Sequence, residues 1–518
     1  MQLLQTRAEL EAWRGISGDR PLRCVPTMGA LHAGHGSLIQ RAGRQGPGEA
    51  RPLVLTSVFV NPLQFGPNED FARYPRCLDA DLKLAQESGA DALFAPSVEE
   101  IYPQGESQLT RVQPPKSLQA GLCGRHRPGH FDGVATVVVR LLSLIRPQVL
   151  LLGEKDWQQL VILKRVVRDL GLPVQVWGCP TLREADGLAM SSRNRYLSSD
   201  ERRQAAVLPQ ALRRAATRCL QEPGLALAAV QAEVHQALEG AGMVVDYVEA
   251  VKPLCLQAQS RLDGLTLLAV AAHCGPSRLI DHVFLMSRAP IVAIDGPAGA
   301  GKSTVTRAFA ERLGLIYLDT GAMYRAVTWL VQDRGVDPTK AEQVAPLLAN
   351  LDLQLSSTGN GQRVRVNGVD VTEAIRSPEV TAQVSVVAAH GCVREALTQQ
   401  QQAMGARGGL VAEGRDIGTA VFPGAELKVF LTATVTERAR RRALDLEQRG
   451  FEVPERADLE AQIAERDHLD STRAVAPLTQ AEDAIELITD GMAIEAVIQR
   501  LVDLFRERVP HDAWPDPS

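Results

Sequence analysis

The sequence predicts an α/β protein made of two successive parts, each built on a mostly parallel sheet. Two patterns typical of phosphate binding lie at strand-to-helix junctions, one near residue 30 and one beginning at residue 296. Around them, short apolar runs alternate with stretches of helical periodicity, as in parallel sheets covered by helices. Since the second pattern belongs near the start of its domain, something of domain size must precede it.

The composition is that of a globular protein rather than a nucleic-acid or membrane protein. The 518 residues suggest two to four domains at ~150 residues each. A net charge of −5 argues against general affinity for nucleic acid. Eight scattered cysteines without a C-x-x-C pair indicate reduced thiols and no zinc site. No signal peptide or membrane span is evident, so we expect a cytoplasmic protein.

The first phosphate-binding pattern is H-x-G-H. An expected strand, Leu22–Val25, is followed by Pro26 and then by His32 and His35, where helical spacing begins. Two imidazoles three residues apart on a first helical turn face the same way and could offset charge on a departing pyrophosphate. Taken alone, however, the pattern favours a packing or surface pair of histidines. Other residues of this half are needed to decide between that interpretation and phosphate binding.

Further polar groups follow expected strands of the first half. The strand Leu53–Val60 ends in Asn61 and Gln64, at the edge where open α/β sheets bind ligands. Amides there are also common loop caps. The buried run Val149–Leu152 leads into Gly153–Asp156, and a polar loop lies at Met190–Arg193, a feature that is ordinary when taken alone.

A smaller cap is expected to complete the first half. Asp200–Gly240 has helical character, and Val244–Ala250 and Leu265–Ala271 are expected strands. We therefore predict a sheet domain over about 1–185 and a cap over 186–285.

Together these elements resemble the pantothenate synthetases, the pantoate–β-alanine ligases. The resemblance covers about residues 1–282 and rests on PTMGALHAGH, FVNPLQF, RPGHFDGV, GEKDWQQL and READGLAMSSRNRYL, with Trp157 where Phe or Tyr is more usual. It implies a Rossmann-like, HIGH-type nucleotidyltransferase fold. It also implies that (R)-pantoate is adenylated by ATP and that β-alanine then displaces AMP to give pantothenate.

The resemblance also implies which residues form this site. The ATP-binding residues would be Met28, Gly29, Ala30, Leu31, His32, Ala33, Gly34, His35, Gly153, Glu154, Lys155, Asp156, Leu182, Met190, Ser191, Ser192 and Arg193. Pantoate and β-alanine would be bound by Asn61, Gln64, His130 and Gln159. The expected catalytic residues are His35, as the proton donor on the phosphate side, Lys155 and Arg193.

The second half opens with a complete G-x-x-x-x-G-K-[ST] pattern. The strand Ile291–Asp295 precedes it and the helix Thr304–Leu313 follows it, which is the context that the pattern requires. Backbone N–H groups of the loop would surround phosphate oxygens, with Lys302 as a catalytic cation and Ser303 as a ligand of Mg²⁺. The ATP-binding residues would be Gly296, Pro297, Ala298, Gly299, Ala300, Gly301, Lys302, Ser303 and Thr304.

Three further elements of the second half are expected. Arg363–Val371 predicts a β-hairpin with an Asn-Gly type I′ turn. Val380–Gln402 predicts one helix. A third element, also a helix, would carry Arg438, Arg441 and Arg442 on one face. Such a face is usually only solvated, but in a phosphate-binding domain it favours a lid over the transferred group.

This half resembles the cytidylate kinases over about residues 287–510. The resemblance rests on VAIDGPAGAGKST, YLDTGAMYRA, EGRDIGTAVFP, ERARRR and ERDHLDSTRAVAPL, while His390-Gly391 replaces the usual residue-plus-proline. It implies a P-loop nucleoside monophosphate kinase fold that transfers the γ-phosphate of ATP to CMP or dCMP. The nucleoside monophosphate would be held by Thr320, Tyr324, Arg325, Ser385, Arg394, Arg415, Asp416, Arg466, Asp470 and Arg473.

The double resemblance predicts one chain with two ATP-using activities, an arrangement known in cyanobacteria, with a ligase at 1–285 and a kinase at 286–518. A tRNA-charging protein is opposed by the acidic balance and the lack of an anticodon-binding region. An inactive half is opposed by the intact motifs. CMP, dCMP and UMP stay open as acceptors. A homodimer through the ligase half is an expectation. Residues 1–285 and 286–518, expressed separately, should each fold and each be active.

Overall fold

The computed structural model describes residues 1–517 except 19, 46–49, 68, 70, 107, 223, 359–360, 449, 451 and 474. The chain forms two compact units. Unit 1 consists of Met1–Ser287 with Pro510–Ala513, and unit 2 of Arg288–Val509 with Trp514–Ser518. No helix in the described part of the chain is long and apolar enough to cross a membrane.

Among the described residues, the first part of unit 1 forms a parallel sheet, as predicted. Its strand order is β1-β4-β3-β2-β5-β6, and every neighbouring pair is parallel. The central strands β2, β3 and β5 therefore direct their carboxyl ends to one edge, where ligands bind in such sheets. The strands are β1 (Gln2–Leu4), β2 (Leu22–Thr27), β3 (Leu53–Val58), β4 (Ala92–Phe94), β5 (Val149–Gly153) and β6 (Gln175–Cys179).

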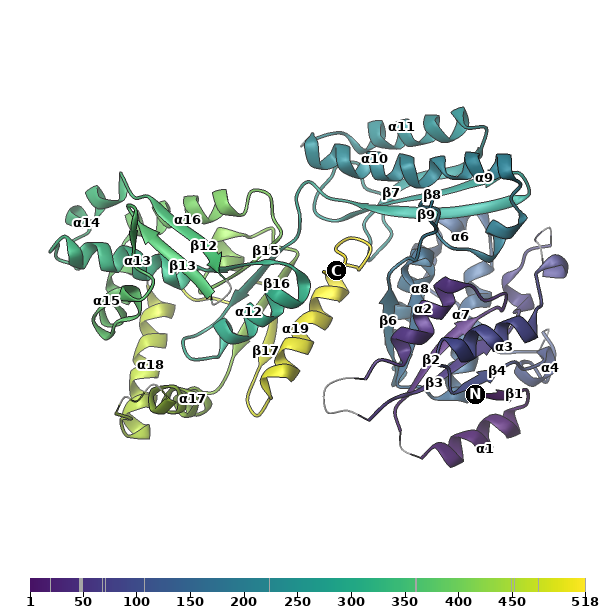
Figure 1. The fold of residues 1–518 in the computed structure, drawn as a ribbon, viewed down its shortest axis with the longest axis horizontal. Coiled ribbons are helices and arrows are strands. Elements are labelled where there is room, and N and C mark those ends of the chain that lie inside the picture. Colours follow the sequence, from purple (N-terminus) through teal and green to yellow (C-terminus); the bar gives the residue numbers. More distant parts are fainter. Residues whose placement is uncertain are drawn as a thin grey trace. The chain divides into compact units, whose positions relative to one another are not determined.

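Helices cover both faces of this sheet (Figure 1). Alternate residues of β3 enter different cores, with Leu53 and Leu55 on one face and Val54 on the other. The core of Val54 includes residues of α2 (Ala33–Ala42) and α3 (Leu78–Glu87). The opposite core packs on α1 (Arg7–Ser17), α7 (His130–Ile145) and α8 (Trp157–Asp169); shorter helices are α4 (Val98–Ile101), α5 (Lys116–Gln119) and α6 (Leu122–His126).

The cap of unit 1 is an antiparallel sheet with helices on its outer face (Figure 1). Leu268 and Val270 of the middle strand pack under α10 and α11, whereas Leu267 and Ala269 join the core of the parallel sheet. The expected helical region divides into α9 (Ser199–Ala205), α10 (Val207–Gln221) and α11 (Leu227–Gly240). The strands are β7 (Val244–Val251), β8 (Thr266–Cys274) and β9 (Ser277–Leu285), of which β9 was not predicted.

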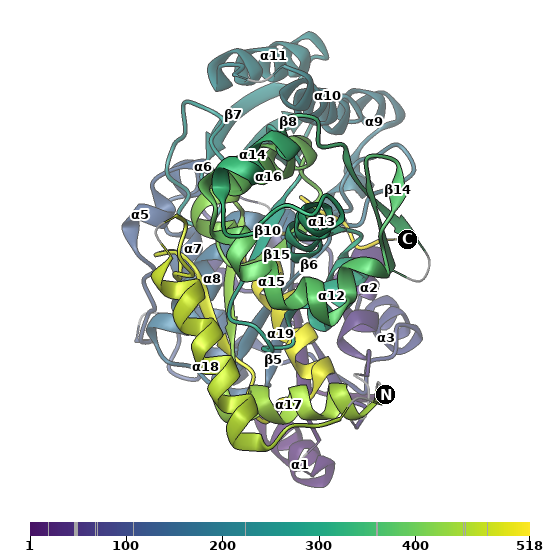
Figure 2. The same cartoon turned by 90° about the vertical axis from the view of Figure 1, so that its left-hand side faces the viewer.

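Unit 2 is built on a second parallel sheet, again as predicted, with strand order β11-β15-β10-β16-β17 among the described residues. α12 and α19 pack on one face, where the rings of Phe309 and Phe505 lie 6.0 Å apart. α13, α15 and α16 share the core of the other face (Figure 2). The strands are β10 (Ile291–Asp295), β11 (Ile316–Asp319), β15 (Leu410–Gly414), β16 (Leu427–Thr432) and β17 (Ile485–Ile488); the helices are α12 (Lys302–Leu313), α13 (Thr320–Asp333), α14 (Ala341–Leu348), α15 (Pro378–Ala389), α16 (Gly391–Met404) and α19 (Ile494–Arg508).

The smaller elements of unit 2 confirm one prediction and correct another. The hairpin forms between β13 (Gly361–Val366) and β14 (Val369–Asp370), next to β12 (Leu353–Thr358). Its central Asn367 and Gly368 have φ of 49° and 83°, as a type I′ turn requires. The single helix expected over 380–402 is wrong, because His390 has extended backbone, with φ −69° and ψ 127°, and separates α15 from α16.

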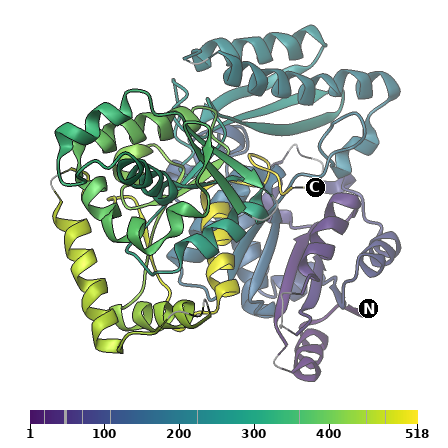
Figure 3. The same ribbon diagram turned by 60° about the vertical axis from the view of Figure 1, so that its left-hand side comes forward.

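A helical pair completes unit 2. α17 (Val435–Gln448) carries the arginine-rich sequence, and α18 (Arg456–Thr472) packs against it (Figures 2 and 3).

Candidate active sites

A cavity of about 790 Å³ opens in unit 1 at the carboxyl ends of β2, β3 and β5. Most of the predicted site residues line it. Of the residues predicted to bind ATP these are Met28, His32, Gly34, His35, Gly153, Lys155, Asp156, Leu182, Met190, Ser191, Ser192 and Arg193, and of those predicted to bind pantoate or β-alanine Asn61, Gln64, His130 and Gln159. Gly29, Ala30, Leu31, Ala33 and Glu154 were predicted as ATP-binding but are not among the lining residues.

The two histidines at the start of α2 are neutral hydrogen-bond donors. The Nδ1 of His32 accepts from the N–H of Gly34 at 3.2 Å, and the Nδ1 of His35 accepts from the N–H of His32 at 3.3 Å. Each neutral ring must therefore carry its proton on Nε2. Burial, with a further contribution from Lys155, lowers the pKa of His32 to about 4 and that of His35 to about 3. They can stabilise phosphate oxygens by donation rather than by a full positive charge.

The loop that precedes these histidines is held by a residue that sequence reasoning missed. The buried carboxylate of Asp81, on α3, accepts from the N–H groups of Ala30 at 3.1 Å and Leu31 at 2.7 Å. Gly29 has φ +84°, and a Cβ there would lie 3.0 Å from the same carboxylate. The available sequence indication was an acidic residue four positions before Ala85, on an otherwise apolar helix face.

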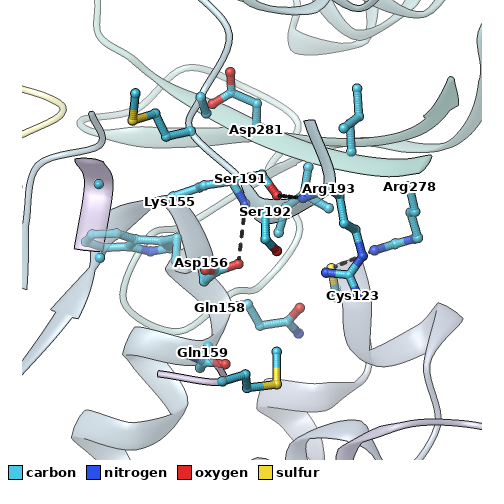
Figure 4. Close-up of a pocket in the computed structure, with 18 of the residues that line it drawn as sticks. Cys123, Lys155, Asp156, Gln158, Gln159, Ser191, Ser192, Arg193, Arg278 and Asp281 are labelled. Carbon is cyan, nitrogen blue, oxygen red and sulfur yellow. Dashed lines mark hydrogen bonds and ion pairs between the residues drawn. The ribbon is translucent and has the colours of Figure 1, made fainter. Parts of the chain in front are cut away.

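Two fixed cations stand at the same cavity (Figure 4). Lys155 follows the end of β5, and its Nζ lies 3.8 Å from Oδ1 of Asp156. Arg193 belongs to a short 3₁₀ turn capped by Ser191, whose Oγ accepts from the N–H of Arg193 at 3.3 Å. Gln159 lies on α8 at the cavity wall. The arrangement can receive several negative charges at once.

Two residues predicted to bind the acceptors, Asn61 and His130, are hydrogen-bonded to Gln64. Asn61 donates to Oε1 of Gln64 at 3.1 Å and accepts from the hydroxyl of Tyr102 at 2.9 Å. Nε2 of His130 accepts a hydrogen bond from Arg127 at 3.0 Å. Its Nδ1–H therefore donates to the backbone carbonyl of Gln64 at 2.8 Å. Burial lowers the pKa of His130 to about 4. Asn61 and His130 therefore orient Gln64.

A second cavity, of about 1270 Å³, lies in unit 2. All ten residues predicted to bind the nucleoside monophosphate line it, together with 298–304 of the phosphate-binding loop. Gly296 and Pro297 do not. Gly296 instead allows a close approach of two strands, since with φ +149° a Cβ there would lie 2.0 Å from the carbonyl oxygen of Leu431.

Lys302 and Ser303 are tied to the protein at the start of α12. The Nζ of Lys302 donates to the carbonyls of Gly296 and Pro297, both at 2.8 Å, and burial lowers its pKa. The hydroxyl of Ser303 donates to Oε1 of Glu413 at 2.5 Å. The other oxygen of Glu413, Oε2, is buried without a hydrogen-bond partner among the described residues, and burial raises the pKa of this carboxyl.

Arginines and aspartates form ion pairs among the residues predicted to bind the monophosphate. Arg394 and Asp416 form a buried pair, and NH2 of Arg473 lies 3.7 Å from Oδ1 of Asp416. Nε of Arg415 donates to Asp470 at 2.9 Å. The guanidinium groups are thus held in place by carboxylates before any anion binds.

Only some of the arginines of the arginine-rich helix α17 line the cavity. Arg438, predicted in the lid, does not line the cavity; it pairs with Asp467 and donates to the Ala298 carbonyl at 3.1 Å. Arg441 and Arg442 do line it, and Arg441 donates to the Ala300 carbonyl at 3.0 Å. α17 is therefore bonded directly to the phosphate-binding loop.

Comparisons with known proteins match both units. The family model described as pantoate-beta-alanine ligase matches residues 2–284, and the one described as cytidylate kinase matches 292–507. A bifunctional pantoate ligase/cytidylate kinase of Parasynechococcus marenigrum (strain WH8102) is 65% identical over 517 residues, 100% of each chain. One of Synechococcus sp. (strain CC9605) is 66% identical over 95% of this chain and 100% of that protein.

A solved structure agrees for the first half. The crystal structure of pantothenate synthetase from Thermus thermophilus is 46% identical, with a TM-score of 0.50, over 55% of this chain and 99% of that chain. With both matched regions and the full-length similarity together, this chain belongs to the family of bifunctional pantoate ligase/cytidylate kinases.

Proposed function

We propose that the unit 1 cavity joins pantoate to β-alanine through pantoyl adenylate, and that the unit 2 cavity phosphorylates CMP or dCMP. The chain is a pantoate–β-alanine ligase and a cytidylate kinase. What carries the assignment of the first site is the convergence of two neutral Nε2–H donors with Lys155 and Arg193 on one cavity.

The first reaction needs charge stabilisation more than a base. A carboxylate oxygen of (R)-pantoate forms a bond to the α-phosphorus of ATP, while the bond from that phosphorus to the bridging oxygen breaks and pyrophosphate leaves. His32 and His35 would donate to the departing phosphates, and Lys155 and Arg193 would offset charge around the phosphorus. The amine of β-alanine then attacks the acyl carbon, and AMP leaves. Gln64 and Gln159 would hold the acceptors, with Asn61 and His130 orienting Gln64.

The second reaction is an in-line transfer. A phosphate oxygen of CMP forms a bond to the γ-phosphorus of ATP, and ADP leaves. Lys302 and the N–H groups of the loop would hold the ATP phosphates, while Arg441 and Arg442 would approach the transferred group from α17. The arginines beside Asp416 and Asp470 would hold the monophosphate. UMP stays open as a further acceptor.

The kinase site also fits Mg²⁺. No cluster of three or more metal-ligating side chains occurs among the described residues, but Mg²⁺ in such sites is usually held by one or two protein oxygens, waters and the phosphates of the nucleotide. Ser303 would be the direct ligand, and the unpartnered Oε2 of Glu413 would accept from a water on the ion. When bound, the ion would neutralise charge on the β- and γ-phosphates.

Product analysis of the purified chain tests both assignments. With ATP, pantoate and β-alanine it should release AMP and pyrophosphate, and with ATP and CMP it should form ADP and CDP. ADP rather than AMP from the first mixture would contradict the adenylate route. We also propose the division 1–285 and 286–518 by activity, and a homodimer through the ligase half; sedimentation equilibrium that shows only a monomer would refute the dimer.

A further inference from the structure

The C-terminal segment, Pro510–Ala513, belongs to unit 1 although it follows α19 of unit 2 in the sequence. It lies outside both family matches, which end at residues 284 and 507. The His511 side chain is 5% exposed, and Ala513 packs against the core of the parallel sheet. A short stretch from the far end of the chain is therefore built into the ligase unit.

The backbone of the C-terminal segment partners a buried carboxylate next to the ATP cavity. Glu154 is 2% exposed and immediately precedes Lys155. Its Oε1 accepts from the N–H of His511 at 3.1 Å, and its Oε2 accepts from the N–H of Asp512 at 2.9 Å. Burial and the nearby Asp512 carboxylate raise the pKa of Glu154 to about 7, whereas these two N–H groups act in the opposite direction. Without the segment, the buried Glu154 carboxylate would lose these two hydrogen-bond donors. Leaving a buried carboxylate without such donors costs free energy.

The side chain of Asp512 binds Thr181, a residue that lines the same cavity. Its Oδ1 accepts from the N–H of Thr181 at 2.8 Å, and its Oδ2 accepts from the hydroxyl of Thr181. Thr181 follows β6 and lines the cavity beside Leu182, a predicted ATP-binding residue. Nε2 of His282, on β9, lies 3.7 Å from Oδ2 of Asp512. The Asp512 carboxylate thus contacts both the loop after β6 and a strand of the cap.

We propose that the C-terminal segment is a working part of the ligase's ATP site, in which Asp512 is the positioning residue for the Thr181–Leu182 wall and the segment backbone holds Glu154 beside Lys155. The proposal rests on the assignment of the unit 1 cavity as the site of pantoate adenylation. The segment is hydrogen-bonded to residues that follow two neighbouring strands, Glu154 after β5 and Thr181 after β6, so it acts on how ATP is held. Small displacements of groups that position a substrate can cost large factors in rate.

The test uses the full-length chain and compares Asp512→Ala with a control in the same tail. Asp516→Ala is the matched control, because Asp516 pairs with Arg506 inside unit 2. In the ligase reaction, Asp512→Ala should raise KM for ATP roughly tenfold and KM for pantoate much less, because the lost bonds lie on the ATP side. Kinase constants should stay within about twofold of the unsubstituted chain, as should both activities of Asp516→Ala.

Two further variants separate positioning from general destabilisation. Asp512→Asn keeps one acceptor oxygen and should restore part of the ATP affinity. Thr181→Val removes only the hydroxyl bond and should raise KM for ATP less than Asp512→Ala does. Combined with Asp512→Ala it should add little, because the two changes break the same contact. If Asp512→Ala fails to fold, the milder Thr181→Val decides by its smaller rise in KM for ATP, with KM for pantoate and the kinase constants unchanged.

An unchanged KM for ATP in Asp512→Ala, or equal loss of ligase and kinase activity, would overturn the proposal. The site assignment is checked separately with Lys155→Ala. If Lys155→Ala abolishes adenylation while Asp512→Ala behaves as the unsubstituted chain, only the role of the segment is refuted. If Lys155→Ala leaves adenylation intact, the assignment of the cavity itself fails.

Discussion

Replacing Lys302 by methionine should abolish the kinase reaction and at the same time make unit 2 more stable. The ammonium group is buried beside two carbonyls, and burial lowers its pKa from 10.5 to about 7. A cation held in this way suits a polyphosphate ligand but is costly in its absence. Methionine keeps most of the volume and removes the charge.

The magnitude follows from the pKa shift. A lysine whose pKa falls from 10.5 to about 7 destabilises the fold by up to on the order of 5 kcal/mol at neutral pH. The two hydrogen bonds that methionine cannot make offset roughly 2 kcal/mol of this. We expect a net gain of about 2–3 kcal/mol. Because the unfolded chain binds more protons between pH 7 and 10.5, the unsubstituted protein gains stability as the pH rises, and the advantage of the variant shrinks.

Calorimetry of the full-length chain measures the stability, with the unit 2 transition identified by its upward shift with CMP. Kinase turnover should fall by at least ~10²-fold, and pantothenate formation should be unchanged. Lys340→Met is the control, since Lys340 is a half-exposed lysine of the same unit, and it should alter neither property. Kinase activity within threefold of the unsubstituted chain, or a unit 2 that is less stable at pH 7, would refute the reasoning.

Three further predictions concern the two sites. His35→Ala should slow pantoate-dependent exchange of pyrophosphate into ATP by roughly 10²-fold and spare the kinase; unchanged exchange would make the histidine purely structural. Unit 1 should lose stability as the pH falls from about 6.5 toward 4, because the pKa values of His32, His35 and His130 are lowered in the folded state and the unfolded chain takes up protons first; a flat unfolding midpoint over this range would contradict the neutral assignment. Arg473→Met should raise KM for CMP at least about tenfold and KM for ATP far less, since Arg473 lies beside Asp416 on the monophosphate side, and an equal rise for both nucleotides would argue against that placement.

The parts of the fold that follow from local sequence were predicted. The two phosphate-binding patterns sit at β2–α2 and β10–α12, because strand runs, turn glycines and helical spacing act over only a few residues. The Asn367-Gly368 turn is of the same kind, since both residues tolerate positive φ. The break at His390 was missed, because Val380–Gln402 keeps helical periodicity on both sides of it.

The supporting groups of the sites could not be predicted, because they depend on contacts between distant residues. Asp81 accepts hydrogen bonds from the loop that contains Leu31, which is 50 residues away in the sequence. Asn61 and His130, which were predicted to bind substrate, line the cavity and are also hydrogen-bonded to Gln64. Residue type at a strand end thus indicated the place of the site but not which polar groups remain available for substrate.

Glu154 shows why a complete set of motifs does not make a complete site. The independence of the two halves stays a prediction; the buried clusters of unit 1 come from 1–287 and that of unit 2 from residues after 288. Yet Glu154 and Thr181 are both hydrogen-bonded to residues of Pro510–Ala513. A few hydrogen bonds of ~1 kcal/mol each weigh little against a core but much in the geometry of an active site. Under our proposal for the C-terminal segment, a ligase half that ends at residue 285 still folds but binds ATP less tightly, contrary to the expectation that each half is fully active alone.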